Sequence, residues 1–90
     1  MNQTGTLTTT DAGTFLGEAR KVILYNDDAH DMDEVVAQIV KAIACTPQRA
    51  EAIMYEAHSK GRAVVIAAHL ERCEHVVAVL GEIGLTTEIE

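Results

Sequence analysis

Three adjacent residues, Asn26, Asp27 and Asp28, place an amide and two carboxylates at the end of an apolar run. Their side-chain oxygens accept hydrogen bonds, and charged acceptors bind cations most strongly. A free α-amino group has an ordinary pKa of about 7.7–8.0, so it is mostly protonated at neutral pH and needs acceptors only. One interpretation is therefore a site for an ammonium group. The other is a strand-to-helix turn in which short polar side chains satisfy loose backbone groups.

The acidic character continues beyond this triplet. Residues 27–34 contain no lysine or arginine and carry the carboxylates of Asp27, Asp28, Asp31, Asp33 and Glu34. Like charges this close repel one another, which suits either a cationic ligand or the positive end of a following helix. A calcium hand is not indicated, because Gln38 occupies the twelfth position from Asp27 and no glycine occupies the sixth.

Residues further along the chain could complete a binding site. Met32, Met54 and Ala57 are either core residues or the wall of an apolar pocket, for which the deformable side chain of methionine is suited. His58, four residues after Met54, is either a solvated or capping residue of its helix or a second anchor for an amine or a peptide backbone.

Metal binding and catalysis have little support in the sequence. His69 and Cys73 are four residues apart, a spacing that two metal ligands on one helix could have. However, Cys73 lies on an apolar stripe, His75 points elsewhere and no paired motif completes four ligands. No activated nucleophile, glycine-rich phosphate loop or spaced acid–base pair is visible. We therefore expect no metal, no cofactor and no enzyme. A metal-dependent or hydrolytic enzyme is kept as an alternative of lower rank, which zinc titration of the purified protein would test.

The hydrophobic pattern predicts the elements that hold these residues. Residues 21–25 alternate as a strand, with Val22 and Leu24 on one side and Ile23 and Tyr25 on the other. A helical stripe with spacings of three and four residues follows. Its members are Met32, Val35, Val36, Ile39, Val40 and Ile43.

Thr46 and Pro47 indicate the start of a second helix, and Lys60 with Gly61 indicates its end. Residues 63–67 are interpreted as a central strand that is apolar on both faces. A third helix from about residue 71 and a strand at 85–89 follow. The inward residues of the two helices are Ala50, Ile53, Met54 and Ala57, then Cys73, Val76, Val77, Leu80 and Ile83. The order β-α-α-β-α-β predicts an α+β fold, a small three-stranded antiparallel sheet with three helices packed on one face.

Length and composition limit the possible functions. The 90 residues form one domain, with a core at 21–90 and a flexible extension at 1–20 that is rich in threonine and glycine. The net charge of −7 argues against binding nucleic acid or an anionic membrane. Two cysteines without CxxC spacing suggest reduced thiols, and neither a membrane span nor a secretory leader is visible. We expect a monomeric cytoplasmic protein.

Several blocks of residues together match a known pattern. They are Val22, Ile23, Leu24, Tyr25, Asn26, Asp27 and Asp28, then Met32, Val35 and Val36, then Ala52, Ile53, Met54, His58, Gly61, Ala63 and Val64. The triplet alone would be a weak signal, but the blocks at this spacing are specific. Over roughly residues 21–90 the chain resembles the ClpS adaptor of the Clp protease.

The resemblance implies an adaptor that binds N-degrons, proteins whose first residue is bulky and hydrophobic (Leu, Phe, Tyr or Trp), and delivers them to a AAA+ unfoldase, ClpA or ClpC. By motif position, Asn26, Asp27 and His58 would hold the α-amino group of the substrate, and Asp28 would border the mouth of the pocket. Met32 would exclude β-branched first residues. The implied lining of the hydrophobic pocket is Met32, Met54, Ala57 and Leu85.

The resemblance also implies two contacts with the unfoldase, Glu71 near the start of the third helix and the extension at residues 1–20. Val76 stands where the family often has a lysine that contacts the unfoldase, so docking is expected to differ. The alternative is a structural protein-interaction domain without N-degron binding, resembling the C-terminal domain of the ribosomal stalk protein. That domain lacks the triplet and His58 and uses a basic helix face, which is missing here.

The pocket region departs from the family pattern in two places. Ala29, His30 and Asp31 replace an aromatic residue, a threonine and a proline, which predicts a more mobile and more acidic loop. Ala57 replaces a larger valine, which predicts either a wider pocket for Trp or Tyr or weaker selection.

Overall fold

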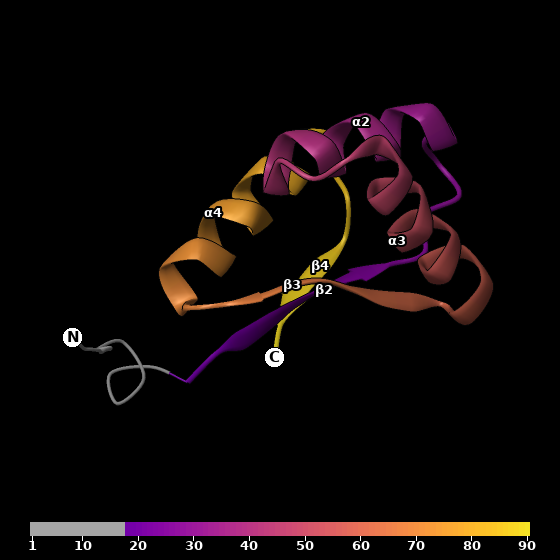
Figure 1. The fold of residues 1–90 in the computed structure, drawn as a ribbon. Coiled ribbons are helices and arrows are strands. Elements are labelled where there is room, and N and C mark those ends of the chain that lie inside the picture. The colour runs from indigo at the N-terminus through magenta and orange to yellow at the C-terminus, as the bar shows by residue number, and fades with distance from the viewer. Residues whose placement is uncertain (1–17) are drawn as a thin grey trace.

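The computed structural model describes residues 18–90 and shows the order β-α-α-β-α-β (Figure 1). The elements are β2 (Arg20–Tyr25), α2 (Met32–Ile43), α3 (Pro47–Lys60), β3 (Arg62–Ala68), α4 (Leu70–Gly81) and β4 (Thr87–Ile89). The predicted α+β class and element order are confirmed. Most of the predicted extension, residues 1–17, lies outside the described residues. Arg20, the last residue assigned to it, is already the first residue of β2.

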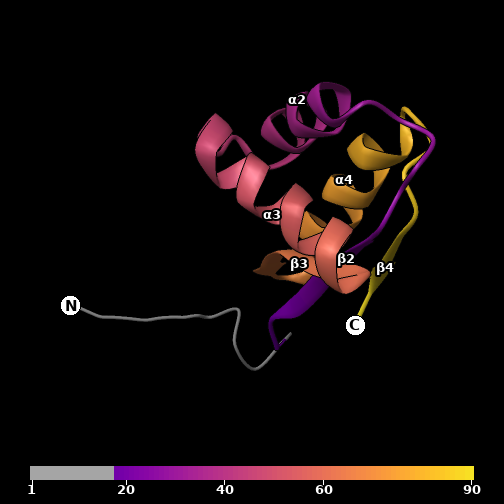
Figure 2. The same cartoon turned by 90° about the vertical axis from the view of Figure 1, so that its right-hand side faces the viewer.

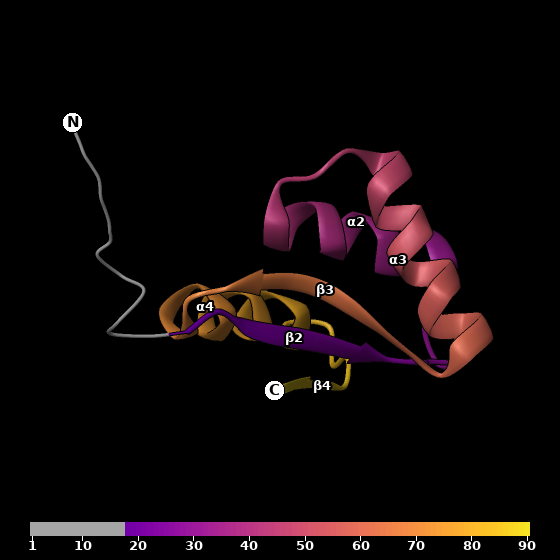
Figure 3. The same ribbon diagram turned by 60° about the horizontal axis from the view of Figure 1, so that its bottom comes forward.

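β2 is the central strand of the sheet. It pairs antiparallel with β3 on one side and with β4 on the other, in the order β3-β2-β4 (Figure 3). The prediction that residues 63–67 form a central strand is therefore wrong, because β3 lies at an edge. An apolar run is typical of a strand buried on both faces, but Val64 pairs with Ile23 on the face that the helices leave open and is 40% exposed.

Polar and aromatic side chains gather on this open face. Tyr25 donates a hydrogen bond to the carboxylate of Glu88, and Nη2 of Arg62 lies 2.6 Å from Oε2 of Glu90. The guanidinium of Arg62 lies 5.8 Å from the ring centre of Tyr25, within the range of a cation–π contact. Ile23 is buried here, outside the core cluster that contains its neighbours along the strand. The predicted two-sided pattern of the strand is therefore confirmed.

All three helices lie on the other face of the sheet (Figures 1 and 2). α3 and α4 pack on β2 and β3, and α2 packs across α3 and α4. The largest fully buried side chains of the core cluster are Val22, Leu24, Ile39, Ile53, Val65, Val76 and Leu80. Of the residues predicted to face inward, Val77 and Ile83 are only partly buried, whereas the unpredicted Val79 is buried. Within residues 18–90, none of the helices has the length and apolarity to cross a membrane.

Local signals set the boundaries of α3. Oγ1 of Thr46 accepts the N–H of Arg49 at 3.1 Å, and Pro47 is the first helical residue, as predicted. Gly61 ends the helix with a φ of 90° and donates its N–H to the carbonyl of Ala57 at 2.8 Å. Residues with a Cβ pay about 1–2 kcal/mol in this left-handed region. The chain therefore turns directly into β3, which brings the end of α3 beside the end of β2.

A buried amide links α2 to α4. Nε2 of Gln38 donates to the carbonyl of Val79 at 2.6 Å and to the carboxylate of Glu82 at 3.1 Å. Nζ of Lys41 contacts the same carboxylate at 2.7 Å. A buried polar group without partners costs about 1–3 kcal/mol, so these bonds favour one position of α2 over α4.

Candidate functional site

The loop from β2 to α2 is fastened at the point where the sheet ends. The backbone N–H of Asn26 donates to the carbonyl of Gly61 at 3.0 Å, and that of Tyr25 donates to the carbonyl of Thr86 at 3.0 Å. The start of the loop is thus held between the end of α3 and the segment before β4. His58 lies in the last turn of α3, three residues before Gly61, so these contacts bring it close to the loop.

The carboxylate of Asp27 holds the loop in shape. Its Oδ1 accepts the backbone N–H groups of Ala29 at 2.7 Å and His30 at 3.0 Å, and its Oδ2 lies 3.0 Å from Nδ1 of His30. Nδ2 of Asn26 donates to Oδ1 of Asp28 at 3.4 Å. The interpretation as a turn held by side chains is therefore confirmed. His30, one of the substituted residues, makes two of these contacts, and the greater mobility expected of the loop stays a prediction.

The contact between Asp27 and His30 favours the charged form of both groups. The side-chain hydrogen bond to Asp27 raises the pKa of His30 above its ordinary value, against the opposing effect of partial burial. Partial burial raises the pKa of Asp27, but the hydrogen bonds from the His30 side chain and from the N–H groups of Ala29 and His30 together hold it below its ordinary value. The side chains of His30 and Asp27 are only 20% and 13% exposed.

A pocket of about 190 Å³ lies beside this loop. Its lining residues are Leu24, Asn26, Asp27, Asp28, His30, Met32, Val35, Met54, Ala57, His58 and Leu85. All the buried members are apolar, and the members that reach solvent are polar except for Met32. The pocket therefore has an apolar interior and a polar mouth. A cavity of about 150 Å³ admits benzene in another protein, so this one has room for a bulky hydrophobic side chain.

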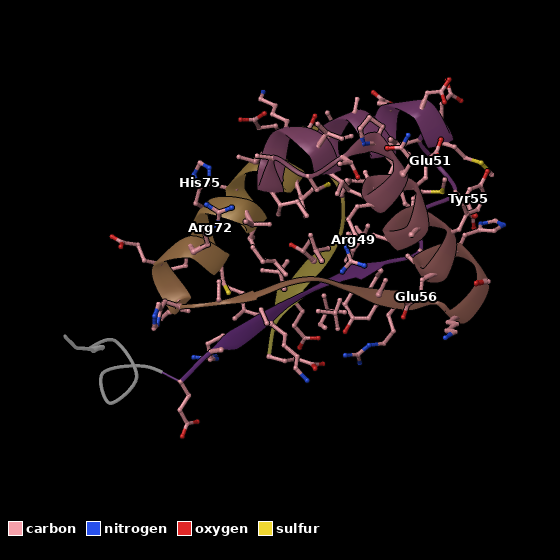
Figure 4. All side chains as sticks on the ribbon, in the orientation of Figure 1. Arg49, Glu51, Tyr55, Glu56, Arg72 and His75 are labelled. Atoms are coloured by element: carbon pink, nitrogen blue, oxygen red, sulfur yellow. The ribbon has the colours of Figure 1, made fainter. Side chains whose placement is uncertain are left out.

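The structure brings together the residues predicted to bind the substrate. Those predicted at the amine site and the mouth (Asn26, Asp27, Asp28, His58) and those predicted in the hydrophobic pocket (Met32, Met54, Ala57, Leu85) all line this pocket. On α3, Met54 and Ala57 face inward, whereas Tyr55 and Glu56 point outward (Figure 4). Met32 is the first residue of α2 and is 46% exposed, which places it at the mouth.

The remaining candidates lie elsewhere. Glu71, the predicted unfoldase contact, is exposed in the first turn of α4 and does not line the pocket. Cys73 is buried on the same helix, with its Sγ 3.4 Å from the carbonyl of Ala68 and 3.6 Å from that of Arg20. In the described part of the chain, no three His, Cys, Asp or Glu side chains are grouped so that they could hold a metal ion.

Sequence reasoning did not assign three of the lining residues to the site: Leu24, His30 and Val35. Periodicity predicts Leu24 on one side of its strand and Val35 on the apolar stripe of its helix, and both belong to the core that the pocket adjoins. Their signal was proximity, since Leu24 lies two residues before Asn26 and Val35 one turn after Met32. His30 is equally close in sequence, two residues after Asp28, but nothing in its spacing indicated that its side chain folds back along the loop to Asp27.

Known proteins are similar to this chain in sequence and in fold. Residues 18–86 match the family model of the ATP-dependent Clp protease adaptor protein ClpS. The chain is 41% identical over 71 residues to the Clp protease adapter protein ClpS of Gloeobacter violaceus, covering 78% of this chain and 76% of the relative. It is 35% identical over 71 residues to the ClpS of Synechococcus elongatus, covering 78% and 75%.

A solved structure agrees with these matches. Agrobacterium tumefaciens ClpS2, bound to L-phenylalaninamide, aligns with a TM-score of 0.71 and 25% identity over 80% of this chain and 96% of that one. The family model covers well over half of the chain, and the relatives match along most of their own length. The chain therefore belongs to the ClpS family, the adaptor proteins of the ATP-dependent Clp protease.

Proposed function

We propose that this adaptor binds the free, bulky hydrophobic first residue of N-degron proteins and delivers them to a AAA+ Clp unfoldase. The observation that carries the proposal is the pocket, whose apolar interior adjoins Asn26, Asp27 and His58 at its polar mouth. The ligand of the similar ClpS2 structure, L-phenylalaninamide, supports it, because its free amine suits the mouth and its aromatic ring suits the interior.

The polar mouth binds the α-amino group of the substrate. A carboxylate offers about four lone-pair positions, and the loop contacts use three of those of Asp27, which leaves one for an ammonium hydrogen. The side-chain carbonyl of Asn26 and a ring nitrogen of His58 supply further acceptors. An acetylated or internal residue would leave these acceptors unpaired when the bound substrate covers them, at a cost of about 1–3 kcal/mol. The site is therefore selective for a chain start.

The apolar interior binds the first side chain. Full burial of a Leu or Phe side chain contributes about 1.5–3 kcal/mol. Together with the amine contacts, and after the loss of association entropy, this supports an affinity in the micromolar range. Met32 at the mouth narrows the passage for β-branched side chains, which carry two substituents next to the backbone. The small side chain of Ala57 leaves room for Tyr or Trp.

Delivery needs contacts outside the pocket. Glu71, exposed at the start of α4, and the extension at residues 1–20 are the proposed contacts with a ClpA or ClpC unfoldase in the cytoplasm. Because Glu71 does not line the pocket, substrate and unfoldase can be bound at the same time. Membership of the ClpS family supports this division of tasks. The adaptor itself catalyses no reaction; the protease does.

A peptide series measured by fluorescence anisotropy tests substrate recognition. Peptides that begin with Leu, Phe, Tyr or Trp are expected to bind with micromolar Kd. The N-acetylated peptides and those that begin with Ile or Val should bind at least about tenfold more weakly, which corresponds to about 1.4 kcal/mol. Equal binding of an acetylated Phe peptide would contradict recognition of the amine, and equal binding of a Val peptide would contradict the role of Met32.

A degradation assay tests delivery. A reporter protein with an N-terminal Phe is degraded by ClpP together with ClpA or ClpC in the presence of the adaptor. Glu71→Lys is expected to slow this reaction while leaving peptide affinity unchanged. Glu74→Lys, an equal change of charge at an exposed position of the same helix, is the matched control. Unchanged degradation with Glu71→Lys would remove Glu71 from the proposed contact.

A further inference from the structure

His30 lies in the pocket and also contacts Asp27. Its side chain lines the pocket, and its Nδ1 lies 3.0 Å from Oδ2 of Asp27. That carboxylate is the group proposed to accept the amine of the substrate. The imidazole is 20% exposed, so it lies within the mouth of the pocket and is not a fully solvated side chain.

The imidazole and a substrate ammonium compete for the same oxygen. Oδ1 of Asp27 already accepts the N–H groups of Ala29 and His30, so Oδ2 is the less occupied of the two oxygens. A protonated imidazole brings a positive charge to this oxygen, which partly neutralises the carboxylate and repels a second cation. A neutral imidazole with its hydrogen on Nδ1 orients the same oxygen without this charge.

Titratable and polar groups of the loop, α2, α3 and the segment after α4 lie near His30. Asp28 of the same loop and His58 of α3 line the pocket with it. Glu34 of α2 and the backbone of Ile83, after α4, both favour the protonated imidazole. These surroundings extend protonation of His30 to higher pH than in a solvated histidine, so competition with the substrate reaches toward neutral pH.

We propose that His30 is an internal cation that competes with the α-amino group of the substrate for Asp27 and thereby sets the affinity of the pocket for N-degrons. This inference deepens the proposed function and rests on it. Binding of one ammonium group favours loss of the proton from His30, so affinity rises with pH through the titration of His30. His30 acts through Asp27 as a positioning residue.

The choice of pH range distinguishes titration of the protein from titration of the peptide amine. Between about pH 5 and 7 the α-amino group remains protonated, since its ordinary pKa is about 7.7–8.0. Asp27 remains charged in this range, because its pKa is held below the ordinary value. A loss of affinity on acidification that depends on His30 therefore points to the pair formed by His30 and Asp27. A variant that removes only His30 isolates this contribution.

The experiment compares the full-length wild type with His30→Asn and His75→Asn. The probes are a fluorescent peptide that begins with Phe and its acetylated counterpart, measured by anisotropy from pH 5.0 to 7.5. Asparagine keeps a neutral N–H donor for Asp27. We expect the ratio of the wild-type Kd to that of His30→Asn to rise at least about fivefold between pH 7.5 and 5.5, since a shift of one unit in the pKa of His30 on binding corresponds to about tenfold.

The controls keep the outcomes distinct. His75, exposed on α4 and outside the pocket lining, should give the wild-type profile after substitution (Figure 4). By NMR, the pKa of the His30 imidazole should fall when the peptide is added to saturation. Parallel pH profiles of wild type and His30→Asn, or a His30 pKa that the peptide does not lower, would overturn the competition while peptide binding persists. Absence of binding at every pH would instead overturn the proposed function, and this inference with it.

Discussion

Asp27 combines an observed structural role with a proposed role in recognition. Its Oδ1 accepts two backbone N–H groups of the loop, which is the turn interpretation of the triplet. The same side chain lines the pocket, which is the geometry that the ammonium interpretation needs. The turn is observed, and the amine site is our proposal. A substitution must therefore remove the charge while it preserves the acceptor.

Asp27→Asn removes the charge of this side chain and keeps an oxygen that accepts hydrogen bonds. The amide oxygen can still accept the N–H groups of Ala29 and His30, so unfolding in urea should change by less than about 1 kcal/mol. Peptide affinity should fall at least about tenfold because the charge that attracts the ammonium is lost. Asp27→Ala should lose the loop hydrogen bonds as well as peptide affinity, and its free energy of unfolding should fall by about 1–3 kcal/mol. Asp33→Asn is the control of equal charge, and an Asp27→Asn variant with normal affinity would exclude the carboxylate as the amine site.

At the scale of elements, the junction of α3 and β3 positions the mouth of the pocket. Gly61 turns the chain with a φ of 90°, and its carbonyl accepts the N–H of Asn26. This bond holds the start of the acidic loop beside the last turn of α3, which carries His58. The open space around Gly61 means that its conformation, and not crowding, is what requires glycine.

A pair of glycine substitutions tests this reasoning. Gly61→Ala should destabilise the domain by about 1–2 kcal/mol, because alanine is strained at positive φ. Gly81 lies in the last turn of α4 with open space around it. Gly81→Ala should therefore leave the stability of the domain unchanged or raise it by up to about 1 kcal/mol. Urea unfolding with an unchanged m-value measures both. Equal effects of the two substitutions would show that the backbone conformation at Gly61 carries no special cost.

At the scale of the whole molecule, the acidic cluster makes one side of an already acidic protein strongly negative. The net charge is −7, and residues 27–34 contribute five carboxylates without a neighbouring lysine or arginine. Under the proposed function, a negative mouth attracts positively charged chain starts and speeds their encounter at low ionic strength. Asp27, one of these carboxylates, also pairs with His30, which links the cluster to the pH dependence of stability.

The pair sets a pH window for stability. The lowered pKa of Asp27 contributes stability above the unfolded pKa of about 3.9, which is lost as pH falls through the folded value. The raised pKa of His30 contributes stability below the unfolded pKa of about 6.5, which is lost as pH rises through the folded value. The urea midpoint of the wild type should therefore decline between pH 6 and 8, and decline less in His30→Asn. His75→Asn should follow the wild type, and an identical decline in all three proteins would remove His30 from this effect.

Local patterns in the sequence determined the order and type of the elements. Helical spacing marked α2, Thr46 and Pro47 marked the start of α3, and Gly61 marked its end, because caps and periodicity act over a few residues. The residues that line the pocket were also largely predicted, since the blocks around Asn26 and His58 match the ClpS pattern.

Only the tertiary structure decided how distant segments meet. The apolar run that contains Val64 could not reveal that β3 is an edge strand, because strand order depends on pairing between segments far apart in the chain. Burial of Gln38 depends on a carbonyl in α4, and the contact of His30 with Asp27 depends on the path of the loop. Periodicity reports which face of an element is apolar, and the packing of the elements determines what that face contacts.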